Sequence, residues 1–309
     1  MAFIRTLLEL ARWDKRIHLV VGDLGFGVVD PFAKEFPQRF INVGVAEQNM
    51  TSIAAGMALC GKMVFTYSIG NFPTLRCLEQ IRNDICHHHA NVKIVSTGGG
   101  FAYGALGASH HATEDIAVMR ALPQMVVVAP GDPVEAQCAT RALIARDGPA
   151  YLRLGRSGEP NVHETPVDFR IGKAIKVAEG SDLTLVTTGA MLHIAVDVAA
   201  SLTVNGIRSR VLSMHTIKPL DTEAIVAAAK ETSAIFTLEE HSIIGGLGSA
   251  VAEVLAENCE RHVLFKRLGI GPMFSPMAGS QEFLRESCSL SVKGVVQTLS
   301  TSLGMSLSC

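Results

Sequence analysis

The sequence predicts an α/β protein of two domains, each a mostly parallel sheet with helices on both faces. Its 309 residues favour two domains over one. Hydrophobic residues make up 48% and charged residues 18%, so the chain can fill large cores. Short continuous apolar runs alternate with amphipathic stretches along the chain, and that order is typical of parallel strands joined by helices.

The first domain is expected over residues 1–156. It begins with an amphipathic helix whose apolar pattern includes Arg5 and Glu9, which is unlike a secretory signal. Buried strands are then predicted at 18–23, 39–44, 63–68, 92–98, 125–130 and 149–155. Helices are predicted at 46–61, with Gly61 as its C-cap, and at 75–89, 114–122 and 132–146.

The second domain is expected over residues 175–309, after a linker at 157–174. Polar residues and two prolines interrupt the alternation around this linker. The pattern then resumes in a smaller α/β unit. Its predicted strands are 183–189, 208–216 and 234–240, and its predicted helices are 191–206, 221–232 and 246–258.

Composition excludes several classes of partner. The net charge of −2 gives no basic surface for nucleic acid or for an anionic membrane. No apolar run approaches the roughly 18 residues needed to span a bilayer. The seven cysteines are scattered, odd in number and without a CxxC pair, which suits a reducing cytoplasm.

Glu47 is the one acid in "NVGVAEQNMTSIAAGMAL", among apolar and small residues. One interpretation is an acid in the first helical turn, stabilised by the helix dipole by about 0.3–1 kcal/mol. The other is a carboxyl group in an apolar cleft, where burial raises the pKa and lets the group share a proton near neutral pH.

Other marked residues have plainer interpretations. Asp23 ends the first strand, in a glycine-rich turn that matches neither a Walker loop nor GxGxxG. His110 ends a glycine-rich loop, where acid–base or hydrogen-bonding use is favoured; a metal site with Glu114 lacks a third ligand. The tract His87–His89 is expected to be solvated at a helix end, so no metal is assigned. "GGLGSA" at 245–250 is a partial dinucleotide fingerprint that close packing explains equally well.

Four segments together resemble the C-terminal half of transketolases. They are "RFINVGVAEQNMTSIAAGMAL", "GASHHATEDIAVMRALPQMVVVAPGDPVEA", "HTIKPLD" and "EEHSIIGGLGSAVAE", in order and at matching spacing over nearly the whole chain. The resemblance implies a pyrimidine-binding domain, a C-terminal domain and thiamine diphosphate as cofactor. It implies transfer of a two-carbon ketol unit from a ketose to an aldehyde.

The resemblance also implies roles for particular residues. Glu47 would bond N1′ of the cofactor's aminopyrimidine and so favour the tautomer that removes the thiazolium proton. Phe72 would pack on the pyrimidine, with Ile69 nearby, although a plain core aromatic is an equal alternative. Asp23 would lie near the cofactor. The substrate would meet His110 at the donor ketose and Arg156 at a phosphate.

Departures from the family pattern imply a split enzyme. The GDG…N motif for diphosphate and Mg²⁺ is absent, and "GDL" at 22–24 is no substitute. A separate N-terminal subunit is therefore expected to hold Mg²⁺, in a two-fold heterotetramer. Gly27, Gly98 and Leu106 stand where the family has a serine, a histidine and an aspartate, which predicts an unusual acceptor.

Three alternatives remain open at this point. A 2-oxoacid dehydrogenase β subunit or a deoxyxylulose-phosphate-synthase-like decarboxylating enzyme shares the fold and the glutamate. A non-catalytic regulatory module of the same fold is a second possibility. A nicotinamide-binding protein is a third, supported only by the partial glycine motif.

Overall fold

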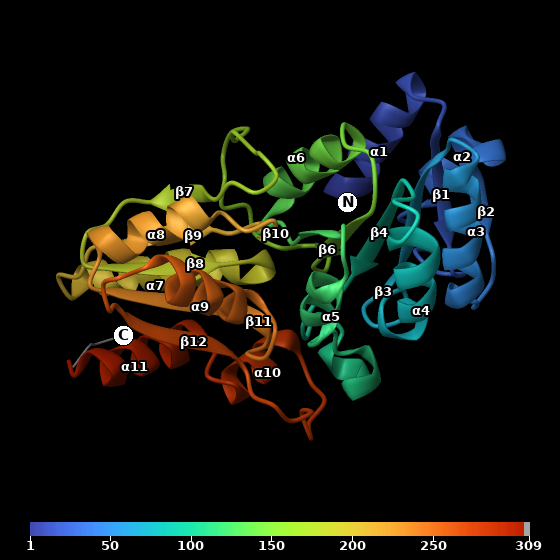
Figure 1. Ribbon diagram of the computed structural model, residues 1–309. Helices are drawn as coiled ribbons and strands as arrows, with labels where there is room; N and C mark the ends of the chain where they lie inside the picture. Colours follow the sequence, from blue (N-terminus) through green and yellow to red (C-terminus); the bar gives the residue numbers. More distant parts are fainter. Residues whose placement is uncertain (306–309) are drawn as a thin grey trace.

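Residues 1–305, which the computed structural model describes, form two sheets that lie side by side with helices around them (Figure 1). The first has seven strands in the order β10-β5-β6-β4-β3-β1-β2, and the second has five in the order β12-β11-β8-β9-β7. Most neighbouring strands are parallel in both. This confirms the predicted fold class.

The first sheet is made largely of fully buried apolar strands. They are β1 (Ile17–Val21), β2 (Phe40–Asn42), β3 (Met63–Ile69), β4 (Val92–Thr97), β5 (Val126–Val128) and β6 (Ala150–Leu154). Alternate side chains of β1 enter different cores, since Leu19 packs with α1 (Ala2–Trp13) and α6 (Pro133–Ile144). Val20 packs with α3 (Glu47–Leu59) and α5 (Asp115–Ala121). The short α2 (Asp30–Glu35) adds Phe32 to the core of Leu19.

The second sheet is covered in the same way. Its strands are β7 (Ile175–Ala178), β8 (Leu183–Thr187), β9 (Ser209–Ser213), β11 (Ala234–Ser242) and β12 (Leu264–Ile270). One face packs against α7 (Leu192–Val204), α10 (Gln281–Ser287) and α11 (Val292–Leu303). The other packs against α8 (Thr222–Glu231) and α9 (Leu247–Asn258).

The strand predicted at 208–216 is wrong in one respect, because it divides between the two sheets. β9 stays in the second sheet, whereas β10 (Thr216–Lys218) pairs antiparallel with β5 in the first. The chain therefore returns to the first sheet after it has begun the second.

The helix predicted at 75–89 is irregular and shorter. It runs as a 3₁₀ turn (Leu75–Cys77), one α turn (α4, Leu78–Gln80) and a π-helical segment (Ile81–Cys86). The histidines 87–89 follow it and are exposed, as expected. The prediction at 46–61 is close to α3. There Gly61, at φ +81°, allows the N–H groups of Gly61 and Lys62 to reach back to Ala58 and Met57.

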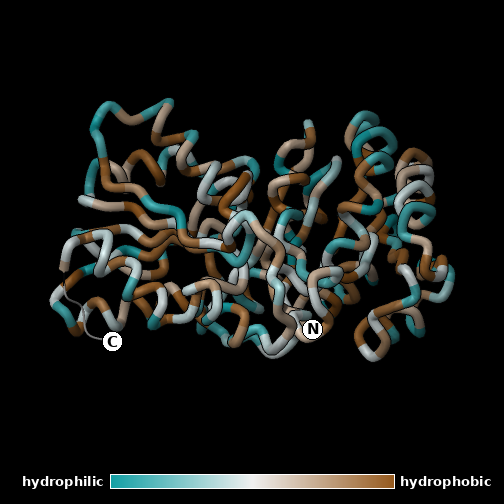
Figure 2. The backbone as a smooth tube through the Cα atoms, turned by 90° about the horizontal axis from the view of Figure 1, so that it is seen from below, coloured by the Kyte–Doolittle hydropathy of each residue, from teal (hydrophilic) through white to brown (hydrophobic). Residues whose placement is uncertain are grey.

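Hydropathy follows the layered arrangement (Figure 2). Hydrophobic stretches run along strands and inner helix faces, and hydrophilic stretches gather at outer turns. In the part of the chain that the structure describes, no helix has both the length and the apolar character needed to cross a bilayer.

Candidate functional site

Glu47 is the first residue of α3 and lies at the carboxyl edge of the first sheet. The loop that follows β2 delivers it there, with Ala46 as the N-cap residue. The residue is only 1% exposed, so its carboxylate is withdrawn from water. A side chain on Gly22 would have its Cβ 3.3 Å from Glu47 Cγ, so the glycine leaves room for the acid.

The carboxylate has an ionic partner that the sequence pattern did not predict. Arg76 Nη1 donates to Glu47 Oε2 at 2.8 Å, and Arg76 is half-exposed. Among the described residues, Oε1 has one weak contact, with Ser68 Oγ at 3.5 Å. The pocket is therefore not purely apolar as expected, and one carboxylate oxygen is held while the other keeps free hydrogen-bonding capacity.

Two aromatic rings continue from this ion pair. The Arg76 guanidinium carbon lies 5.0 Å from the centre of the Phe72 ring, in cation–π range. The His110 ring meets Phe72 edge to face, with centroids 5.2 Å apart. Glu47, Arg76, Phe72 and His110 thus form one contiguous group, here called the Glu47 edge. It brings together three of the residues singled out in the sequence.

The other predicted residues lie around this edge. Ile69 ends β3, and its carbonyl accepts a hydrogen bond from the Phe72 N–H at 3.0 Å. Asp23 lies two positions after β1 with φ +56°, and Asn42 donates to its carboxylate at 2.9 Å. Its neighbour Gly22, and not Asp23 itself, borders Glu47.

Arg156 lies on an exposed loop after β6. Within the described residues it makes no hydrogen bond or ion pair with the Glu47 edge. It borders two cavities of about 470 and 550 Å³, both of which also touch Tyr103 and Glu159. Burial raises the pKa of Glu159 to about 7. Neither cavity is lined by Glu47, so the arginine belongs to a separate part of the surface.

The three departures from the family pattern differ in their surroundings. A Cβ on Gly27 would meet nothing within 4 Å, and Leu106 is 57% exposed. A Cβ on Gly98 would lie 2.2 Å from the ring of Tyr103. Tyr103 therefore fills the space where a side chain at position 98 would stand, which no local sequence signal indicated.

A buried polar cluster joins the two halves of the molecule beside the site. Arg153 Nε donates to Asp115 Oδ2 at 2.7 Å, and Tyr151 Oη donates to the same oxygen at 2.5 Å. Burial opposes ionisation of Asp115, but Arg153 outweighs it, so the pKa of Asp115 lies below its ordinary value. Arg153 Nη2 also reaches the carbonyl of Glu240 on β11, at 3.1 Å.

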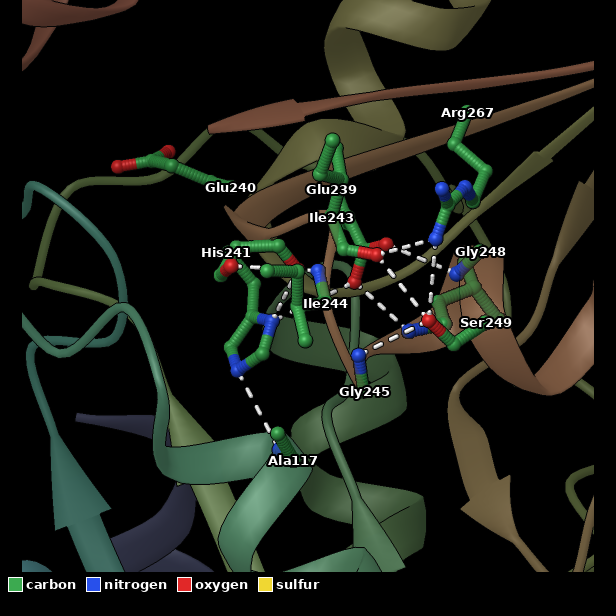
Figure 3. A network of polar contacts seen from close by, with 12 residues as sticks. Ala117, Glu239, Glu240, His241, Ile243, Ile244, Gly245, Gly248, Ser249 and Arg267 are labelled. Atoms are coloured by element: carbon green, nitrogen blue, oxygen red, sulfur yellow. Dashed lines mark hydrogen bonds and ion pairs between the residues drawn. The ribbon is translucent and has the colours of Figure 1, made fainter. Parts of the chain in front are cut away.

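His241 makes a second link between the halves (Figure 3). Its Nδ1 lies 2.8 Å from the Ser242 carbonyl, which can only accept, so Nδ1 carries the proton. Nε2 then accepts from the Ala117 N–H in the first turn of α5, at 3.3 Å. Burial lowers the pKa of His241 to about 4, in agreement with this neutral ring.

The donor set at the Glu47 edge fits a pyrimidine ring better than a metal. Glu47 offers a buried carboxylate oxygen, and Phe72 offers a half-buried ring for stacking. Asn71 beside it has a buried amide oxygen without a partner among the described residues. The structure brings together no three His, Cys, Asp or Glu able to hold a metal ion in residues 1–305.

Comparison with known proteins agrees with this geometry. Residues 1–160 match the model for the transketolase pyrimidine-binding domain, and residues 172–295 match that for the transketolase C-terminal domain. One of the two subunits of an apulose-4-phosphate transketolase from Phocaeicola vulgatus is 44% identical over 259 residues, 83% of either chain.

Two further relatives extend over almost the whole length. A 6-deoxy-6-sulfo-D-fructose transketolase subunit from a Clostridium species is 38% identical, covering 96% of this chain and 91% of its own. A solved split-gene transketolase, described as an inactive β4 tetramer, superposes with a TM-score of 0.88 and 38% identity, covering 98% and 97%. The chain therefore belongs to the transketolase family and corresponds to its C-terminal half, the pyrimidine-binding and C-terminal domains.

Proposed function

We propose that this chain is the C-terminal subunit of a split transketolase that transfers a two-carbon ketol unit from a ketose to an aldehyde. The observation that carries the proposal is Glu47, a buried carboxylate with one free oxygen, beside the partly exposed ring of Phe72. Membership of the family implies thiamine diphosphate, which supplies a nucleophilic carbon for this transfer when bound.

Each residue of the edge has a task in this proposal. Glu47 holds a proton at the pyrimidine N1′ through its free oxygen, while Arg76 fixes the carboxylate by its other oxygen. Phe72 packs on the pyrimidine, with Ile69 at the same strand end and Asp23 close by. His110 moves protons at the oxygens of the reacting sugar, since its ring faces the edge and is only partly buried.

The diphosphate and Mg²⁺ are assigned to a partner subunit that carries the GDG…N motif. This chain lacks the motif, and relatives of similar length are named as transketolase subunits. The cofactor then lies between the two chains, in a two-fold heterotetramer. The scattered cysteines favour a cytoplasmic location.

The substrate is proposed to carry an anionic end, bound by Arg156. Relatives are named for sugars with a phosphate or a sulfonate. Tyr103 fills the space beside Gly98, and Leu106 presents an apolar side chain, so two polar groups that the family offers to an ordinary pentose phosphate are missing. An acceptor other than a common pentose phosphate follows from this.

Reconstitution with the partner subunit tests the proposal. The complex is supplied with thiamine diphosphate, Mg²⁺ and a panel of ketose donors and aldehydes with phosphate, sulfonate or neutral ends. We expect ketol transfer with anionic substrates and slow turnover of pentose phosphates. Fast turnover of pentose phosphates would reject the acceptor class. Release of CO₂ from pyruvate would assign the decarboxylating alternative instead, and no turnover with bound cofactor would favour a regulatory module.

A further inference from the structure

The loop that carries His110 lies against the second half of the molecule. Residues 98–113, here the His110 loop, connect β4 to α5. Gly100 and Ala112 pair across the loop by two backbone hydrogen bonds of 2.9 and 3.0 Å. The ring of the buried His111 meets Phe101 edge to face at 5.1 Å, and its Nε2 lies 3.1 Å from the Gly104 carbonyl. The loop is therefore a compact unit that moves, if it moves, together with His110.

Several bonds from the second half hold this unit. The Phe101 N–H donates to Glu240 Oε1 at 2.5 Å, and the Ser242 N–H donates to the Thr113 carbonyl at 2.8 Å. The Gly279 N–H donates to the Gly104 carbonyl at 3.3 Å. One end of the loop, its middle and its other end are thus all bonded to residues beyond the linker.

Glu240 has the most constrained of these contacts. It is 2% exposed, and Arg285 donates to its Oε2 at 2.7 Å through Nε. Gln281 donates to Oε1 at 2.9 Å. A Cβ on Gly100 would lie 2.6 Å from this carboxylate, so the glycine at φ +65° permits the close approach. A charged, rigidly held acceptor therefore faces the loop backbone.

We propose that Glu240 is a positioning residue for His110. The connection runs from the carboxylate to the Phe101 N–H, from the Phe101 ring to His111, and along the chain to His110, whose ring lies against Phe72. Loss of the carboxylate frees the loop and separates His110 from the Glu47 edge. The catalytic part of this inference rests on the proposed function of His110, and the structural part does not.

Glu239 provides a matched control from the adjacent position of β11. Its carboxylate is equally buried but points away from Glu240 (Figure 3). It accepts from the N–H groups of Leu247 and Gly248 at 2.7 and 2.8 Å, at the start of α9. Its removal perturbs the second half alone.

Amide hydrogen exchange on the isolated chain tests the structural part. We expect Glu240→Gln to speed exchange in residues 101–112 at least tenfold, and Glu239→Gln to speed it only in the first turn of α9. Gly100→Ala, whose methyl group pushes the loop off Glu240 from the other side, should reproduce the effect of Glu240→Gln. Unchanged exchange of the loop in both Glu240→Gln and Gly100→Ala would overturn the proposal.

A double-mutant cycle in the reconstituted enzyme tests the catalytic part. We expect Glu240→Gln and His110→Ala each to lower kcat about tenfold or more, and the double variant to lie within about twofold of His110→Ala. Glu239→Gln combined with His110→Ala should instead show the product of the two single effects. Independent, multiplying losses for Glu240 and His110 would overturn the catalytic part. Full activity of His110→Ala would refute the proposed role of His110 and that part with it, while exchange still decides the structural part.

Discussion

Two arginine–carboxylate pairs in the first half of the molecule have nearly the same length and opposite surroundings. Arg76 meets Glu47 at 2.8 Å and Arg153 meets Asp115 at 2.7 Å. The side chain of Arg76 is 47% exposed, whereas that of Arg153 is 5% exposed and also bonds the Ala112 and Glu240 carbonyls. The first pair can exchange a contact for a ligand, and the second fixes the halves to each other.

The largest expected effect is on catalysis at the Glu47 edge. We expect Glu47→Gln to lower kcat of the reconstituted enzyme by about 10²–10⁴-fold, because a positioned proton-transfer group contributes that much. Glu35→Gln is the control, since Glu35 also pairs with an arginine, Arg12, but at the far surface of α1. A Glu47→Gln enzyme as active as the Glu35→Gln control would remove the catalytic half of the comparison.

The largest expected effect on stability is at the other pair. Arg153→Met should lower the free energy of unfolding by about 3–5 kcal/mol, because it leaves Asp115 buried without its counterion. The corresponding change at an exposed pair, Arg12→Met, should cost less than about 1 kcal/mol. Urea denaturation of the isolated chain measures both. Equal losses would mean that burial does not distinguish the two kinds of pair.

Acidification should weaken the interdomain contacts through His241. Its pKa is about 4 when folded and ordinarily 6.5, so between these values the unfolded chain binds the extra proton and stability falls as pH falls. From pH 7 to 5 the expected contribution is on the order of 2 kcal/mol. His241→Gln, which keeps an acceptor but does not titrate, should show a correspondingly smaller loss over this range. The same pH dependence in both proteins would contradict the neutral, buried ring.

The smallest effect is expected at Arg76. Arg76→Gln should cost less than about 1 kcal/mol of folding free energy, because the side chain is half-exposed. It should lower kcat/KM about tenfold, through looser orientation of the Glu47 carboxylate. Isothermal titration of the reconstituted enzyme with thiamine diphosphate shows whether the loss is in cofactor binding. A loss as large as that of Glu47→Gln would mean that the two residues act as one unit.

The sequence predicted the buried strands well, because continuous apolar runs such as those of β1, β3 and β4 have few other stable uses. It missed β12, an edge strand where Lys266 and Arg267 interrupt the apolar run. It also missed β7, α10 and α11. β10 was merged with β9, because the intervening Met214 and His215 are buried like strand residues.

The site was predicted in part for a similar reason. Glu47 stood out locally as a single acid among small residues, and His110 ended a recognisable loop. The partnership of Glu47 with Arg76, and the contact of Glu240 with the His110 loop, join segments far apart in the chain. Residue type and spacing carry no signal for such contacts, since an arginine on a helix and a glutamate at a strand end are both ordinary.

β10 has a consequence for any attempt to divide this chain. A fragment that stops in the linker lacks the antiparallel neighbour of β5, and the apolar residues Val126–Val128 would then form an open border with unpaired amides. Such a fragment should self-associate through that border, however well its own core is filled. The two halves are consecutive in sequence yet interlocked in space, so they exchange and recombine as a single piece.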